Sequence, residues 1–94
     1  MMGGSASARD DLIAHLRGSE AEQVALLQAF LRAPSANPPG DTRPAAAVLA
    51  RFLADRGLAP AIHAAQPELP NIVATLAGGR PGGHLVFNGH MDVF

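Results

Sequence analysis

Three consecutive apolar residues, Leu85, Val86 and Phe87, constrain the fold of this 94-residue sequence more than any other feature. They follow a glycine-rich segment at 78–83 and precede polar residues, which is the pattern of a short β-strand. A strand whose successive side chains are all apolar is typical of a central strand that is buried on both faces. Such a strand needs cover on two sides, and the two clear amphipathic helices of this chain can cover only one. We therefore interpret the chain as the front part of a larger α/β domain.

The composition predicts a thin hydrophobic core. Hydrophobic residues make up 48% of the chain, but many of them are alanines, and there are four Phe and no Trp or Tyr. Alanine buries little area, so we expect marginal stability for this chain in isolation. Because the sequence has no cysteine, disulfides and thiolate chemistry are excluded, and a metal would have to be bound by histidine and carboxylates.

The charge distribution excludes several classes of partner. The net charge is −1, and seven arginines and eight acidic residues are spread along the sequence without a basic patch. This predicts no nucleic-acid binding. No apolar run approaches the roughly 20 residues that cross a bilayer, and the first residues lack the apolar core of a signal peptide. We expect no membrane contact and a cytoplasmic location.

The first part of the chain predicts a leader followed by a helix. Residues 1–18 are expected to be a flexible leader that includes a short helix over Asp10–Arg17. Ser19 and Glu22 have the spacing of a capping box, which predicts that a helix begins at Glu20. Apolar residues at helical spacing extend that helix to about Arg32.

The rest of the chain predicts a second helix and three strands. The segment 34–41 is rich in proline and is expected to be a loop. A helix is expected over Arg43–Arg56, with Gly57 as its C-terminal cap. Strands are expected over Leu58–Ala65 and Asn71–Ala77, and Leu85–Phe87 is the third. The predicted fold class is therefore α/β, with two amphipathic helices followed by three strands.

The candidate site lies directly after the third predicted strand. Asn88, His90 and Asp92 share one face if the backbone stays extended. The Asp92 carboxylate could accept a hydrogen bond from one ring nitrogen of His90, which would raise the basicity of the other nitrogen toward a divalent metal. Spacing alone leaves two interpretations open, a metal ligand with its orienting carboxylate or a pair of surface residues.

Several motifs together resemble one protein family. They are Leu-Leu-x-x-Phe-Leu-Arg at 26–32, Pro-Ser-x-Asn-Pro-Pro-Gly-Asp at 34–41, Pro-Asn-Ile-Val-Ala at 70–74 and Asn-Gly-His-Met-Asp-Val at 88–93. In this order they resemble the dinuclear zinc hydrolases that include aminoacylase, acetylornithine deacetylase, succinyl-diaminopimelate desuccinylase and glutamate carboxypeptidase. The likeness covers about residues 20–94. Phe94 departs from the valine that usually continues the last motif.

The resemblance implies a fold, a site and an activity. Residues 19–94 would be the N-terminal portion of an α/β/α metallohydrolase catalytic domain, truncated in this chain. His90 would be a zinc ligand, and Asp92 the catalytic-site carboxylate that orients it. Two zinc ions, for which cobalt could substitute, would activate a water that attacks an amide of an N-acyl amino acid or small peptide. The family's other ligands and its glutamate base come from later sequence, so we expect the 94-residue chain alone to be inactive.

A second interpretation stays open. The chain could be a non-catalytic α/β fragment, either a relic or an interaction module that binds a partner through an unpaired sheet edge and a helix face. The histidines His15, His63 and His84 match no ligand position of the family. The oligomeric state is open in both interpretations.

Overall fold

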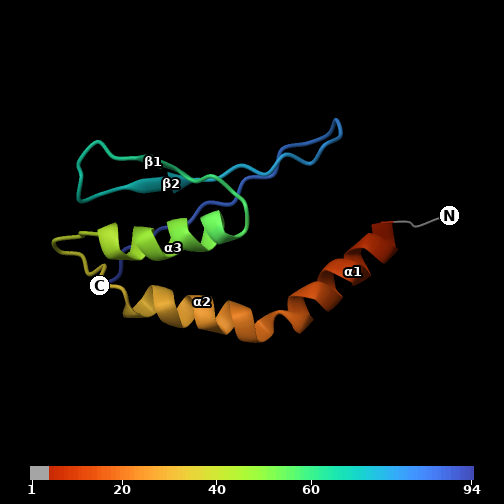
Figure 1. Ribbon diagram of the computed structural model, residues 1–94, viewed down its shortest axis with the longest axis horizontal. Helices are drawn as coiled ribbons and strands as arrows, with labels where there is room; N and C mark the ends of the chain where they lie inside the picture. Colours follow the sequence, from red (N-terminus) through yellow and green to blue (C-terminus); the bar gives the residue numbers. More distant parts are fainter. Residues whose placement is uncertain (1–4) are drawn as a thin grey trace.

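Three helices precede a small sheet in the computed structural model, which describes residues 5–94 (Figure 1). The chain is a mixed α/β structure, as predicted. The elements are α1 (Ser5–Gly18), α2 (Glu20–Arg32), α3 (Arg43–Asp55), β1 (Ala61–His63) and β2 (Asn71–Val73). Helix α3 lies between α2 and the sheet, and α1 extends away from these layers (Figure 1).

The molecule is elongated for its size. It measures 54 × 30 × 22 Å, and its radius of gyration is 16.3 Å, whereas a compact chain of this length has a radius of about 12 Å. Its accessible surface of 7632 Å² exceeds the roughly 5,100 Å² of a compact monomer of the same mass. A large share of the apolar side chains is therefore exposed.

The bounds of α2 are those predicted, but its start is stabilised differently from the predicted capping box. The Ser19 N–H still donates to the carbonyl of His15 at 3.0 Å, so the helical bonding of α1 continues into the junction. The Ser19 hydroxyl donates to the carbonyl of Leu16 at 3.2 Å and makes no cap hydrogen bond to α2. Glu22 forms an ion pair with Arg56 instead. The prediction of the capping box was wrong because α1 precedes α2 with almost no break.

Residues 5–9 of the predicted leader belong to α1, together with the predicted helix Asp10–Arg17. Extending a helix adds one hydrogen bond for each residue fixed, so the alanine-containing segment before Asp10 continues it readily. Residues 1–4 lie outside the described part.

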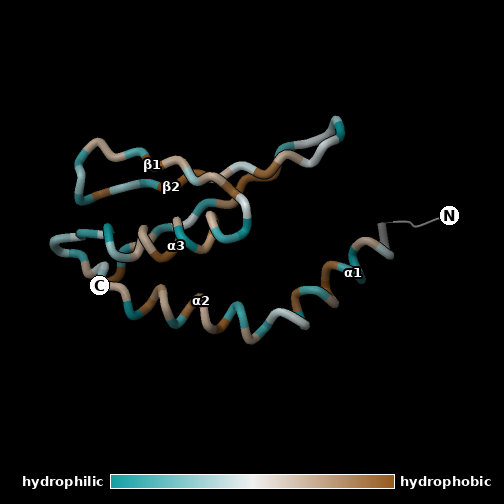
Figure 2. Tube along the Cα trace, in the orientation of Figure 1, coloured by the Kyte–Doolittle hydropathy of each residue, from teal (hydrophilic) through white to brown (hydrophobic). Residues whose placement is uncertain are grey.

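In Figure 2 hydrophobic and hydrophilic residues alternate along α1 and α2, and Leu12 and Leu16 on α1 are at least half exposed.

The core lies at the start of α3. Ala45 is fully buried, Ala46 is 4% exposed, and none of the large side chains in the described residues is fully buried. Thr42, which precedes the helix, is also buried, and its N–H donates to the carbonyl of Glu68 at 3.1 Å. This bond attaches the start of α3 to the turn before β2. The core is as thin as the composition predicts.

The sheet has two strands over residues 5–94, where the sequence predicts three. β1 and β2 pair antiparallel with Ile62 opposite Ile72, and both are shorter than predicted. Leu85, Val86 and Phe87 are 77%, 71% and 89% exposed and form no strand here, so the predicted third strand is not confirmed. They lie instead in an arm over residues 74–88 that leaves the body and returns (Figure 1). A strand needs a hydrogen-bonded neighbour, and none of the described segments pairs with this one.

Figure 2 shows that the tip of this arm is hydrophilic and that its apolar residues lie closer to the body.

Within residues 5–94, none of the helices combines the length and the apolar content that a membrane span requires.

Gly57 ends α3 as predicted, at a φ of +77°. Its N–H donates to the carbonyl of Ala54, and the N–H of Leu58 donates to the carbonyl of Leu53, each at 3.0 Å. These two bonds form a Schellman motif, which requires a left-handed residue at this position.

Replacing Gly57 with alanine is therefore expected to lower the free energy of unfolding by about 1 kcal/mol, because alanine is strained at positive φ. Gly18→Ala is the matched control, since Gly18 ends a helix at ordinary φ and a Cβ there meets open space. Urea unfolding followed by circular dichroism measures both variants. Equal losses in the two variants would contradict the cap assignment.

Candidate functional site

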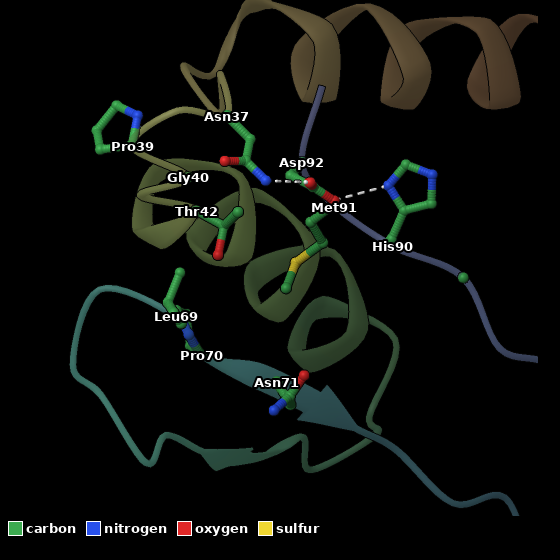
Figure 3. Close-up of a pocket in the computed structure, with 11 residues that line it drawn as sticks. Asn37, Pro39, Gly40, Thr42, Leu69, Pro70, Asn71, His90, Met91 and Asp92 are labelled. Carbon is green, nitrogen blue, oxygen red and sulfur yellow. Dashed lines mark hydrogen bonds and ion pairs between the residues drawn. The ribbon is translucent and has the colours of Figure 1, made fainter. Parts of the chain in front are cut away.

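A cavity of about 360 Å³ lies beside the start of α3 and contains both predicted site residues (Figure 3). Three separate segments line it, with residues from 37–42, 69–71 and 89–92. These segments overlap three of the four motifs that carry the family resemblance. The fold thus brings together side chains that lie more than 50 residues apart in the sequence.

Backbone hydrogen bonds position the last of these segments. Ala36 and Val93 form an isolated parallel bridge. The Asn37 N–H donates to the carbonyl of Val93 at 2.6 Å, and the Val93 N–H donates to the carbonyl of Ser35 at 3.0 Å. Ser35 is 6% exposed, so these backbone hydrogen bonds lie at the buried end of the loop 34–41. The segment 34–41, predicted as a loop, therefore holds the segment that carries His90.

The predicted hydrogen bond between His90 and Asp92 is present. His90 Nδ1 lies 2.8 Å from Asp92 Oδ1 (Figure 3). A carboxylate only accepts, so the proton of this bond is on Nδ1 and the lone pair of a neutral ring is on Nε2. The His90 side chain is 83% exposed and that of Asp92 is 38% exposed, so Nε2 is accessible to an ion. Asn88, predicted on the same face, does not line the cavity.

Asn37 makes the second contact to this carboxylate. Its Nδ2 donates to Asp92 Oδ2 at 3.1 Å, across 55 positions of sequence. This hydrogen bond, followed by that of His90, holds the pKa of Asp92 below its ordinary value. The sequence identified the proline-rich motif around Asn37 but gave no signal that its amide reaches Asp92.

The lowered pKa of Asp92 gives a testable pH dependence. The folded-state pKa lies below the unfolded value of about 3.9, so the contribution of these contacts is fully present above that pH and is lost as pH falls through the folded pKa. A ¹³C NMR titration of the Asp92 carboxyl is expected to show a midpoint below 3.9 that rises in Asn37→Ala. Asn71→Ala, a cavity-lining residue without a contact to Asp92, should leave the midpoint unchanged; a rise there would contradict the assignment.

The described residues can supply one metal ligand at this cavity. A neutral imidazole held by a carboxylate is a suitable zinc ligand, but a zinc site has about four. Between residues 5 and 94 there is no cluster of three or more histidine, aspartate or glutamate side chains that could hold an ion. His15, His63 and His84 lie on α1, in β1 and on the arm, and none of them lines the cavity. The arrangement therefore fits part of a metal site.

Comparisons with family models, with curated proteins and with solved structures find no match to this chain. The order of the motifs and the geometry at the cavity are therefore the features that indicate a function.

Proposed function

We propose that this chain is the N-terminal part of a zinc-dependent hydrolase that cleaves amide bonds of N-acyl amino acids or small peptides. The observation that carries this proposal is the convergence of three family-like motifs on one cavity, with the exposed His90 ring among the lining residues and its Nδ1 held by Asp92. Residues 19–94 would then be the first part of an α/β/α catalytic domain. The cytoplasmic location expected from the sequence belongs to the same proposal.

Each site residue has a definite role in this proposal. His90 is a metal ligand through Nε2, and Asp92 holds the ring in the tautomer that leaves Nε2 free. Zinc, when bound, supplies a Lewis acid and an activated water for attack on the amide carbonyl. The other ligands come from outside the described residues, since residues 5–94 contain no group of three or more histidine, aspartate or glutamate side chains that could hold an ion. The 94-residue chain by itself is accordingly inactive.

The test uses the protein as the cell makes it. An epitope tag is placed at the 5′ end of the gene, and the isolated product is analysed for mass, zinc content and hydrolysis of N-acetyl and N-succinyl amino acids and dipeptides. We expect a product larger than the 9.7 kDa chain plus its tag, with two zinc ions and amidase activity. A zinc-free 9.7 kDa product would refute the proposal, and so would zinc-dependent hydrolysis by the purified 94-residue chain.

The exposed arm favours a second candidate function, a non-catalytic interaction module. Leu85, Val86 and Phe87 are all more than two-thirds exposed, and apolar patches of this kind mark contact surfaces. The same tagged preparation separates the two candidates. An interaction module would be isolated as the short, zinc-free chain in a stable complex, and that complex would weaken in Phe87→Ser. The hydrolase would be isolated with its metal and with Phe87 covered by its own chain.

A further inference from the structure

We propose that Asn37 is a positioning residue that sets the orientation and tautomer of His90 by acting through Asp92. The inference rests on the proposed function in one respect, that His90 binds a metal. The geometric part, a chain of contacts from the proline-rich loop to the imidazole ring, stands without it.

Asp92 joins the two other side chains through its separate carboxylate oxygens. Oδ1 accepts the hydrogen bond from His90 Nδ1 at 2.8 Å, and Oδ2 accepts the one from Asn37 Nδ2 at 3.1 Å (Figure 3). A carboxylate bound at one oxygen can still rotate about its side-chain torsions, which are soft at an sp²–sp³ bond. With both oxygens bound, the carboxylate plane is fixed, and with it the position of Oδ1 facing the ring.

The amide of Asn37 suits this role because the backbone of Asn37 is hydrogen-bonded to the segment that carries Asp92. The Asn37 N–H donates to the carbonyl of Val93, the residue after Asp92, at 2.6 Å. Backbone and side chain of Asn37 therefore hold two adjacent residues. The orientation of the amide is also determined, since its carbonyl oxygen facing a carboxylate would be repulsive and its NH₂ group is the donor.

Gly40, in the same loop, lies next to the Asn37 side chain. Its N–H donates to the carbonyl of Ala36 at 2.8 Å, which closes the loop around Asn37. Gly40 has a φ of +88°, and a Cβ there would lie 3.4 Å from Asn37 Cγ and Oδ1. The loop thus brings its backbone into van der Waals range of the Asn37 amide, in a left-handed conformation that favours glycine. The chain of contacts therefore runs from Gly40 through Asn37 and Asp92 to His90.

The consequence concerns Nε2, the ring nitrogen on the side of His90 away from Asp92 (Figure 3). A free neutral imidazole exchanges its proton between Nδ1 and Nε2, and only the Nδ1–H form leaves Nε2 as a metal ligand. Asp92 selects that form, and Asn37 keeps Asp92 in place to do so. Removing the Asn37 donor is expected to leave the His90–Asp92 contact intermittent.

The test measures tautomer and metal affinity separately in the 94-residue chain. With ¹⁵N-labelled histidine and no metal, long-range ¹H–¹⁵N spectra at a pH where the ring is neutral report the tautomer of His90. Wild type is expected to be mainly Nδ1–H, and Asn37→Ala and the isosteric Asn37→Asp are expected to shift toward Nε2–H. Titration with ZnCl₂, followed at the His90 ring, should then show about three- to tenfold weaker binding in both variants.

Asn71→Ala is the matched control, because it removes an asparagine side chain from the same cavity without a contact to Asp92. It should retain the wild-type tautomer and zinc affinity, and far-UV circular dichroism should be equal in all variants. An unchanged His90 tautomer in both Asn37 variants would overturn this inference while leaving the proposed function intact. Zinc binding that survives His90→Ala would instead refute the proposed function, and the tautomer result would still decide the role of Asn37.

Discussion

In the longer, zinc-containing product proposed above, replacing His90 with alanine is expected to weaken zinc binding by about a hundredfold or more. Loss of an orienting partner alone typically costs ten- to a hundredfold in metal affinity, and loss of the ligand itself costs more. His90 is the one imidazole that lines the cavity within residues 5–94, so the described part of the chain has no substitute for it. Titration with ZnCl₂ under NMR or calorimetric detection measures the effect.

His84→Ala is the control for this prediction. His84 is also an exposed imidazole, but it lies on the arm and not at the cavity. Its removal should leave the zinc affinity within about twofold of wild type. If both variants lose affinity equally, zinc is bound by surface imidazoles without a specific site, and the metal-ligand role of His90 fails.

The largest expected effect on folding comes from Ala45→Asp. Ala45 is fully buried at the start of α3, and burial of an unpaired carboxylate costs several kcal/mol. Single domains have a net stability of only about 5–15 kcal/mol, and this chain buries little apolar area. We expect the cooperative thermal transition of Ala45→Asp, followed by circular dichroism at 222 nm, to disappear.

Ala47→Asp is the matched substitution for comparison. Ala47 is exposed in the same part of α3, and an aspartate near a helix N-terminus interacts favourably with the helix dipole. Its melting temperature should stay within a few degrees of wild type. If Ala47→Asp is as damaging as Ala45→Asp, helix propensity rather than burial determines the result, and the core is not where the structure places it.

The local features of this chain could be predicted because each depends on neighbours a few residues away. The extent of α2 to Arg32 followed from apolar spacing, and the end of α3 followed from Gly57, whose positive φ closes the helix. The pairing of His90 with Asp92 followed from a spacing of two residues. Hydrogen bonds at such short separation are specified by the sequence itself.

Other features needed the tertiary structure. Leu85–Phe87 has the composition of a buried strand, but burial depends on a partner segment, and none of the described residues supplies one. The capping box at Ser19 failed because the preceding helix α1 continues almost to the start of α2. In both cases the sequence pattern indicates a local preference, and contacts with other segments determine which structure forms.

The same distinction applies to the site. The sequence by itself predicted the candidate site residues, an imidazole and a carboxylate two positions apart. Only the tertiary structure showed the cavity and the amide of Asn37, which reaches Asp92 across 55 positions. The physical reason is that a contact of such separation depends on chain closure by the Ala36–Val93 bridge and on the packing of α3, which no local pattern encodes.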